Sequence, residues 1–593
     1  MTATSWQIGF VFVVLALALA LFVWGRWRYD LVALAALLVV AMAGIVPAES
    51  AFSGFGHPAV ITVAAVLILS RGLRNAGVVD VIAGLLLRAG SGPVLQVTLI
   101  SLSVALLSGF MNNVGALALL LPVTIQMARK SGNPPSLLLM PLAFGSLLGG
   151  LFTLIGTPPN IIVAAARADG EGRFRMFDFA PVGLSVMALG VAFIALLGWR
   201  LVPRRKGTAS REELFHIEDY TTELRVTEKS AWIGKTVGDM EESLEGGLTV
   251  AGLARGKRRL LVPSQWEALR EGDILIAEGD SDAIKALTDK GGLKLAGSGE
   301  PREQELQSDE IAITEAVVRP ESFIVGRTAS SLLLRTRYGV NLLAVARHGR
   351  RLKERLARVR LRQGDILLLQ GQRSRLGEAI GQLGCLPLAE RELRIGKPRR
   401  VLLAVLIFAA AVVSTVSGLL AVEIAFVLAC AVMILGGFLS LTEAYESVDW
   451  PVIVLLAAMI PVGEAMETTG GSALLAQLLL KTGDGLPPAA TLAILLLVTM
   501  AFSNIVNNAA IAVVMAPIAV SLSEGLHVSA DPFLMAVALG ASSAFLTPIG
   551  HQSNTLVMGP GGYEFGDYWK LGLPLSLIVV AAGVPLILHF WPL

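Results

Sequence analysis

Long apolar runs dominate the first and last thirds of the chain. Examples are Ile8–Trp24, Leu31–Val46, Leu402–Leu420 and Ile424–Leu441, each long enough as a helix to cross most of a bilayer's hydrocarbon core. The first run has no basic segment before it and two arginines soon after it, so we interpret it as a retained span and not as a cleaved leader. The pattern predicts a polytopic α-helical membrane protein.

The middle of the chain has a different pattern, with short alternating runs rich in charge. Most of the 48 Lys and Arg fall between residues 203 and 400. We therefore expect soluble domains at 203–300 and 301–398, between membrane parts at 1–202 and 399–593. Basic clusters at 204–206 and 397–400 flank this insert, and the positive-inside rule then predicts a cytoplasmic insert in a multi-pass protein of the inner (plasma) membrane.

Composition supports this interpretation and excludes several function classes. Of the 593 residues, 54% are hydrophobic and 16% charged, and the mean hydropathy is +0.68, which soluble proteins rarely reach. Two cysteines, Cys385 and Cys430, are too few for a disulfide framework or a zinc cluster. The chain carries no Walker loop or dinucleotide fingerprint, so we expect neither an enzyme nor an organic cofactor. A membrane-tethered insert also argues against nucleic-acid binding.

An internal repeat relates the two membrane parts. The matching stretches are Asn112-Asn113 before Pro122 with Asn507-Asn508 before Pro517, and Thr153–Asn160 with Thr547–Asn554. An odd number of crossings between the copies predicts opposite orientations, with re-entrant hairpins at about 93–127 and 487–522. Inverted repeats with a site at the bilayer midplane are a recurring design of secondary transporters.

The insert is also duplicated. Predicted strands at Leu248–Ala254 and Ile274–Glu278 recur at Leu342–Ala346 and Ile366–Leu369, each pair accompanied by a helical stretch. The expected fold is thus a helical membrane protein with inverted repeats, two re-entrant hairpins and tandem small α+β domains. Arg255 and Arg347 occupy matching positions in these domains. They either bind a phosphate-bearing regulatory ligand or lie in solvated basic loops, and we favour the solvated loops.

The asparagine pairs are the main candidates for substrate binding. An Asn carbonyl oxygen can bind a cation and its NH2 group an anion, without the desolvation cost of a charge. At a hairpin tip, the returning helix also presents free N–H groups and the positive end of its dipole, which favour an anion. Interhelical hydrogen bonding is the alternative role. The repetition favours binding at Asn112, Asn113, Asn507 and Asn508.

Each membrane part also contains a predicted helix break, at 156–160 and at 550–554. Two prolines in the first break free carbonyl groups one turn earlier, and its glycine permits close backbone approach. A purely structural kink is the alternative role of each break. His551 could donate a hydrogen bond to an anion, but a single His in such a break is about as often a packing residue. The candidates for anion contact are Thr157, Pro158, His551 and Gln552. Oxygen atoms at the tips and breaks are candidate Na⁺ ligands, at Asn113, Gly156, Asn508 and Gly550.

The stretches Leu154–Asn160, Pro548–Gly550 and Gly559–Tyr563 resemble motifs of the divalent anion/sodium symporter family. That family includes sulfate and dicarboxylate permeases, and the resemblance covers both membrane parts. The insert resembles paired C-terminal domains of regulators of K⁺ conductance, which occur in sulfate-permease-like members. The resemblance implies a homodimeric elevator transporter that holds an anion and Na⁺ between the hairpin tips and the helix breaks.

One departure from the family pattern affects the expected substrate. Dicarboxylate carriers of this family have Ser-Asn-Thr at both tips, whereas the tips here read Asn112-Asn113-Val114 and Asn507-Asn508-Ala509, so both hydroxyl positions are lost. Val114 and Ala509 are included among the candidate substrate-binding positions. The loss of these hydroxyls favours a compact oxyanion, sulfate first, over a dicarboxylate or tricarboxylate. From other classes, an anion channel gated by the insert and a membrane sensor remain open, although the chain shows no selectivity-filter sequence.

Overall fold

The computed structural model describes residues 5–24, 27–87, 90, 92–167, 174–205, 221–243, 248–255, 258–261, 263–279, 287, 292–295, 311–320, 322–347, 350–352, 356, 359–388, 398–471, 474 and 486–593. Lys206 and Lys397, one from each basic cluster that flanks the insert, lie outside the described residues.

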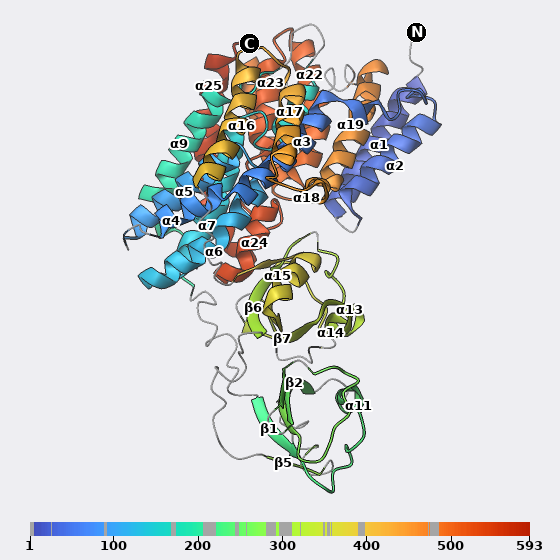
Figure 1. Ribbon diagram of the computed structural model, residues 1–593. Helices are drawn as coiled ribbons and strands as arrows, with labels where there is room; N and C mark the ends of the chain where they lie inside the picture. Colours follow the sequence, from blue (N-terminus) through green and yellow to red (C-terminus); the bar gives the residue numbers. More distant parts are fainter. Residues whose placement is uncertain are drawn as a thin grey trace.

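The helices before the strands form the N-terminal half (Figure 1). Proline occupies the first turn of α3, α5, α8 and α9, where its missing N–H costs no intrahelical hydrogen bond. The elements are α1 (Ser5–Trp24), α2 (Tyr29–Met42), η1 (Ser53–Gly56), α3 (Pro58–Ala76), α4 (Val78–Leu86), α5 (Pro93–Ser108), α6 (Asn113–Ser131), α7 (Ser136–Gly149), η2 (Gly150–Phe152), α8 (Pro158–Ala165), α9 (Ala180–Leu196) and η3 (Gly198–Arg200).

The helices after the strands form the C-terminal half and pack against the first set. A capping box of Ser440 and Glu443 begins α18. The elements are α16 (Pro398–Val416), α17 (Val422–Leu435), α18 (Leu441–Glu446), α19 (Trp450–Thr468), α21 (Pro488–Ser503), α22 (Asn508–Leu526), α23 (Asp531–Ala541), α24 (Gln552–Gly561), η7 (Phe565–Asp567) and α25 (Tyr568–Phe590).

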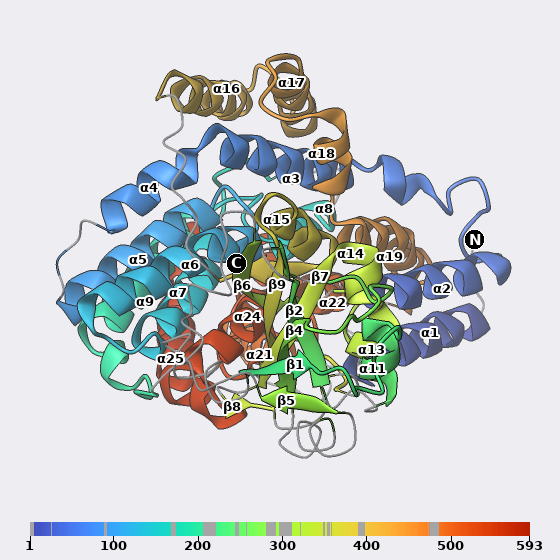
Figure 2. The same ribbon diagram turned by 60° about the horizontal axis from the view of Figure 1, so that its bottom comes forward.

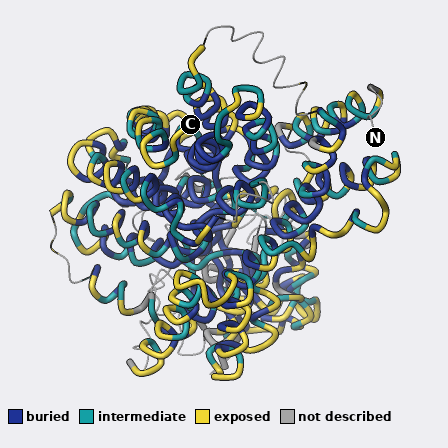
Figure 3. Tube along the Cα trace, turned by 90° about the horizontal axis from the view of Figure 1, so that it is seen from above, coloured by how far each residue is buried: buried dark blue, intermediate teal, exposed yellow. Residues whose placement is uncertain are grey.

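Four helices in the described part of the chain are long and apolar enough to cross a membrane. They are Pro58–Ala76, Arg399–Val416, Asn508–Leu526 and Phe565–Phe590. Most of Arg399–Val416 is exposed despite its apolar sequence, as expected for a helix that faces lipid. Figure 3 shows buried positions gathered in the middle of the helical body and exposed ones on its outer turns.

Both predicted hairpins are helix–turn–helix units in the structure. In the N-terminal half, α5 and α6 are joined by a short turn that ends at Asn112. In the C-terminal half, α21 and α22 are joined by an equivalent turn that ends at Asn507. The two predicted helix breaks are also present, because the chain leaves helical geometry between η2 and α8 and between α23 and α24. The asparagine pairs and the breaks therefore lie at helix starts in both halves.

The described strands form two five-stranded antiparallel sheets. The first sheet has the order β3-β2-β4-β1-β5, and the second has the order β10-β6-β9-β7-β8, which is the same topology read in reverse. Both sheets carry an irregularity in the equivalent strand, at Val250/Gly252 in β2 and at Leu342/Ala344 in β7. The first sheet consists of β1 (Thr221–Val226), β2 (Leu248–Arg255), β3 (Arg258–Leu261), β4 (Ile274–Gly279) and β5 (Leu293–Leu295). The second consists of β6 (Ile311–Val318), β7 (Val340–Arg347), β8 (Arg350–Arg351), β9 (Ile366–Gln372) and β10 (Cys385–Pro387).

The four predicted strands are confirmed, and each extends slightly beyond its predicted end. Short helices accompany the sheets, namely α11 (Val237–Ser243), α13 (Ala329–Leu332), α14 (Leu334–Tyr338) and α15 (Arg373–Gln382). The second sheet lies between the helical body and the first sheet (Figures 1 and 2).

Candidate functional site

Asn112 and Asn507 act as N-caps of the two returning hairpin helices. The Oδ1 atom of Asn112 accepts a hydrogen bond from the Val114 N–H at 3.0 Å, and Oδ1 of Asn507 accepts one from the Ala509 N–H at 2.9 Å. Because these two N–H groups are already bonded, an anion at either tip would be bound by other donors. The sequence marked these residues as polar exceptions, but their capping role needed the structure.

The second asparagine of each pair is buried, with a different environment in each half. Asn113 accepts a hydrogen bond at Oδ1 from the Ser108 hydroxyl at 2.6 Å. Asn508 uses Oδ1 to accept from the Ala509 N–H at 2.9 Å, and its Nδ2 atom has no hydrogen-bond partner among the described residues. With only 5% of Asn508 exposed, a buried amide donor is left available.

The first helix break brings Thr157 next to Asn113. A Cβ atom added at Gly150 would lie 2.7 Å from the Asn113 Oδ1 atom and 3.2 Å from the Thr157 Cβ atom, so this glycine is needed for the close approach. Thr157 begins α8, with Pro158 at the first helical position. The Thr157 hydroxyl is buried and has no hydrogen-bond partner in the described part of the chain. Asn113 at the start of α6 and Thr157 at the start of α8 therefore both lie against Gly150.

The second helix break has different chemistry. His551 is almost fully buried and caps α24, because its Nδ1 atom accepts a hydrogen bond from the Ser553 N–H at 3.0 Å. Gly550 lies against the end of α21, where an added Cβ atom would be 2.7 Å from the Ser503 carbonyl oxygen. Gln552, the first residue of α24, is half-buried. The structure therefore gives His551 a defined capping role.

A second pair of asparagines holds both breaks open. Asn160 donates from Nδ2 to the carbonyl oxygens of Gly150 at 3.1 Å and Thr153 at 2.8 Å. Asn554 donates in the same way to Ala544 at 2.8 Å and Thr547 at 3.0 Å. These bonds satisfy carbonyl groups that a continuous helix would have paired. Sequence reasoning used both residues to align the repeat without assigning them this role.

The breaks are also tied to the hairpins of their own halves. Thr153 donates its hydroxyl hydrogen to the Gly109 carbonyl, and Thr547 donates to the Asn504 carbonyl. The Ser108 hydroxyl shares its single hydrogen between Asn113 Oδ1 at 2.6 Å and the Ser146 carbonyl oxygen at 2.7 Å, and Ser503 donates to the Ala541 carbonyl at the equivalent place. Each hairpin tip is therefore held against the break of the same half by matching bonds.

The candidate site is completed across the two halves. Helix α8 packs against α22, the helix that begins at Asn508, while α24 packs against α6 and α7. One polar contact marks this crossing, since the Ser146 hydroxyl donates to the Ser553 hydroxyl at 3.2 Å. Each broken helix thus lies beside a hairpin helix of the other half.

The far ends of the broken helices are anchored to the opposite half by different chemistry. Beyond α8, Arg167 binds Asp531 at the start of α23, with 2.6 Å between Nη2 and Oδ2. Beyond α24, the Tyr563 hydroxyl donates to the Ser136 carbonyl and accepts from the Met140 N–H at 2.9 Å. One end therefore uses a largely buried ion pair and the other a neutral hydroxyl.

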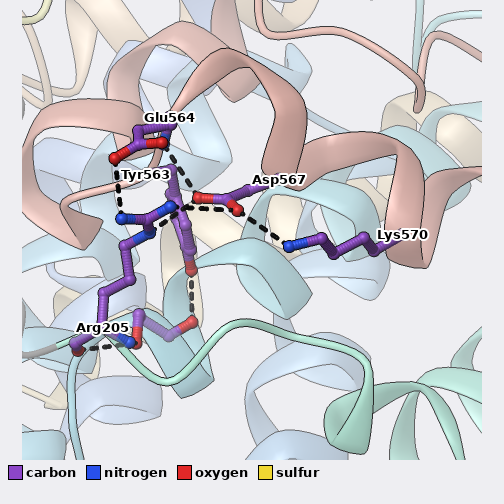
Figure 4. A network of polar contacts seen from close by, with 6 residues as sticks. Arg205, Tyr563, Glu564, Asp567 and Lys570 are labelled. Carbon is purple, nitrogen blue, oxygen red and sulfur yellow. Dashed lines mark hydrogen bonds and ion pairs between the residues drawn. The ribbon is translucent and has the colours of Figure 1, made fainter.

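Figure 4 shows that the Tyr563 end continues into a charged network. Arg205 binds Asp567 at 2.8 Å and Glu564 at 2.8 Å, and Lys570 binds Asp567 at 3.3 Å. The Asp567 hydrogen bond raises the pKa of Arg205. Because Arg205 is where the described N-terminal half ends, this network fixes the exit of the chain beside α24.

Arg255 and Arg347, the candidates for a regulatory ligand, both form ion pairs within their sheets. Arg255 makes two bonds of 2.8 Å to Asp273, which raise its pKa, and a further bond of 2.9 Å to Glu267. Arg347 makes two bonds of 2.7 Å to Asp365. Both arginines lie on strands, in β2 and β7, so the favoured interpretation as solvated loops is wrong. A ligand at either arginine would compete with these carboxylates, and ligand binding there stays a prediction.

The candidate Na⁺ ligands are oxygen atoms of the tips and breaks. Among the described residues, no group of three or more His, Cys, Asp or Glu side chains could hold a metal ion. Na⁺ binding would depend on carbonyl and amide oxygens, which unwound helix segments provide. Asn113 and Asn508 each place an amide oxygen at a hairpin tip, which makes these two Oδ1 atoms candidate ligands.

Comparison with known proteins agrees with a transporter. The family model described as "Citrate transporter" matches residues 19–540. The "Uncharacterized transporter YfbS" of Escherichia coli (strain K12) is 32% identical, over 98% of each chain. The "Putative sulfur deprivation response regulator" of Chlamydomonas reinhardtii is 28% identical, over 95% of this chain and 98% of its own length. "Sodium/sulfate cotransporter 1" of the same alga is 27% identical, over 62% of this chain and 44% of its own.

The first of these relatives matches over nearly its whole length, and the family match covers most of the helical halves and the sheets between them. Both agree with the apolar helices and exclude an enzyme as the function of this chain. The chain belongs to the citrate transporter family.

Proposed function

We propose that the protein is a secondary active symporter that imports a small divalent anion, sulfate first, together with Na⁺. The observation that carries this proposal is the paired arrangement of helix starts. Four of them, at α6, α8, α22 and α24, occur at the matched hairpin tips and breaks. Buried donors of Asn508 and Thr157 are left available there.

The donor set suits a compact oxyanion. Helix N-termini carry partial positive charge, and amide and hydroxyl donors add direction without a buried formal charge. The related dicarboxylate carriers have a hydroxyl side chain at the positions of Val114 and Ala509. Thr157, which lies near Asn113, supplies one hydroxyl in their place. A tetrahedral oxyanion accepts hydrogen bonds on every side, so it can be bound by donors from both halves. Sulfate is also the anion in the name of the algal cotransporter.

The architecture proposed for this transport is that of inverted repeats with α5/α6 and α21/α22 as re-entrant hairpins. The protein would work as a homodimer in the inner (plasma) membrane, by an elevator movement, with the sheets in the cytoplasm. The equivalent bonds of the two halves support the repeat, and the shortness of α5 and α21 supports the hairpins.

The test is uptake into proteoliposomes with an imposed Na⁺ gradient. Labelled sulfate should accumulate, and unlabelled sulfate and thiosulfate should compete better than succinate, citrate or phosphate. Accumulation without Na⁺ dependence would exclude Na⁺ as the coupling ion. Competition by succinate or citrate, but not by sulfate, would exclude sulfate as the substrate.

Citrate or another carboxylate is the second candidate substrate, and the family description favours it. The same competition panel decides between these substrates. From other classes, a gated anion channel predicts flux that is linear in driving force, and a sensor predicts no flux at all. The sensor gains support from the name of the full-length algal relative.

A further inference from the structure

The second sheet is buried on both of its faces. On β9, Leu367 and Leu369 belong to the sheet's own apolar core, whereas Ile366 and Leu368 belong to the core of the helical body. Strands β6 and β7 divide their residues in the same manner. The sheet is therefore packed against the helices through a continuous apolar face.

The turn at Gly364 approaches helix α24 closely. A Cβ atom added at Gly559 would lie 2.2 Å from the Gly364 carbonyl oxygen, and one added at Gly364 would lie 3.5 Å from the Thr555 carbonyl oxygen. Thr555 and Gly559 share one face of α24, because they are one turn apart. The glycine in this helix permits backbone-to-backbone contact with the sheet.

The contact involves two helices that begin at the candidate site. Helix α24 begins at Gln552, and α6 begins at Asn113. Near the end of α6, Arg129 approaches Glu315 of β6 to 3.9 Å. The second sheet thus touches α6 near its end and α24 along its length, from Thr555 in the first turn to Gly559.

The position of the Gly364 turn is set by Asp365 and its partners. Arg347 binds both carboxylate oxygens of Asp365 at 2.7 Å, and the Arg362 N–H donates to the same carboxylate at 2.8 Å. Backbone bonds between this turn and Val318 fasten it to β6. Loss of the Arg347–Asp365 pair would leave a buried carboxylate without its charge partner and loosen the turn.

The first sheet has the equivalent Arg–Asp ion pair, but its equivalent turn does not lie against a described helix. Arg255 and Asp273 repeat the geometry of Arg347 and Asp365, and Gly272 occupies the equivalent turn. A Cβ atom added at Gly272 would meet nothing within 4 Å. On the equivalent strand, Arg225 pairs with Ile274 where Val317 pairs with Ile366, so a charged side chain replaces an apolar one. The first sheet therefore serves as a matched internal control.

We propose that the second sheet is the part of the insert that controls transport. It holds α24 through the Gly364 turn, and Arg347 and Asp365 act as positioning residues for that turn. The contact stabilises the observed position of α24, so any conformation in which α24 moves relative to the sheet loses it. This role rests on the proposed transport function, although the contact itself can be tested without a substrate.

The first experiment compares Arg347→Gln with Arg255→Gln by amide hydrogen exchange on the full-length protein in detergent. We expect exchange at residues 552–561 to become about tenfold faster in Arg347→Gln and to stay at the wild-type rate in Arg255→Gln, because only the first loosens a docked turn. Equal exchange of these amides in both variants would overturn the proposal.

The second experiment measures the uptake rate of Gly559→Ala, which pushes against the Gly364 carbonyl, beside Gly84→Ala on α4, where an added Cβ meets nothing within 4 Å. We expect a change of about threefold or more in maximal rate for Gly559→Ala alone. Its effect should not add to that of Arg347→Gln, because both act on one contact. Uptake at the wild-type rate by Gly559→Ala would contradict the proposal that the second sheet controls transport. If the wild type transports no anion of the panel, the proposed function fails, while hydrogen exchange still decides the contact.

Discussion

The two helical halves make the same backbone-holding bonds with different side chains at the candidate site. Thr153 and Asn160 have their equivalents in Thr547 and Asn554, which bind the same carbonyl positions. Around them the chemistry differs. The Asn113 oxygen is bound by a serine, whereas the Asn508 amide donor is left available.

The difference teaches which positions are structural. Thr153, Asn160 and their equivalents hold the tips against the breaks, and their hydrogen-bond donors are bound to backbone carbonyls. Buried donors are left over at Asn508, whose surroundings differ from those of its equivalent Asn113, and at Thr157, whose equivalent is His551. An anion bound by these two donors would be held asymmetrically, by a hydroxyl of one half and an amide of the other.

The largest effect is expected from Asn508→Ala, which should abolish uptake with little change in thermal unfolding, since its Nδ2 atom has no partner among the described residues to lose. Asn113→Ala should also abolish uptake but should lower stability by about 1 kcal/mol, because Ser108 loses one acceptor. The measurements are initial uptake rates and unfolding in detergent. Uptake at the wild-type rate in either variant would contradict the site.

Gly150→Ala should reduce uptake by about tenfold, because its Cβ atom would displace Asn113 and Thr157. The equivalent position in the C-terminal half is naturally Ala544, whose carbonyl binds Asn554 as the Gly150 carbonyl binds Asn160. Ala544→Gly is therefore the matched control and should keep most activity. If the two variants lose activity equally, the proposed difference between the two halves of the site is wrong.

Thr157→Val should raise KM for the anion by about fivefold, since it removes one donor while keeping the shape of the side chain. Thr157→Ser restores the hydroxyl and should return KM to near the wild-type value. A KM that is unchanged in Thr157→Val would exclude this hydroxyl from substrate binding. KM is measured from the initial uptake rate of each labelled anion as a function of its concentration.

The smallest effects on uptake are expected at the outer anchors, where the change is mainly in stability. Arg167→Gln removes the ion pair that joins the end of α8 to Asp531 and should cost about 3 kcal/mol. Tyr563→Phe removes two neutral hydrogen bonds, to the Ser136 carbonyl and from the Met140 N–H, and should cost about 2 kcal/mol. Unfolding of both variants in detergent decides whether the ion-paired anchor is the stronger one. Equal losses would remove this distinction between the halves.

Sequence reasoning located the hairpins, the breaks and the strands because each has a local signal. Asparagines, glycines and prolines stand out in apolar helices, and alternating runs mark strands. It did not find the capping role of His551 or the carbonyl-holding role of Asn160 and Asn554. Those roles depend on which loop carbonyls lie within hydrogen-bond reach, and residue spacing does not contain that information.

By itself, the sequence determined a polytopic helical protein with a repeated half, two asparagine pairs at helix starts and a duplicated insert, because these features follow from hydropathy and spacing. Only the tertiary structure decided that Thr157 lies beside Asn113, that Asn508 keeps a donor, and that the Gly364 turn of the second sheet lies against α24 while the equivalent Gly272 turn meets none of the described residues within 4 Å. The physical reason is that the two sheets have the same topology, but one face of the second sheet is apolar where the first sheet carries a charged residue. Whether such a face is covered depends on contacts between residues far apart in the chain.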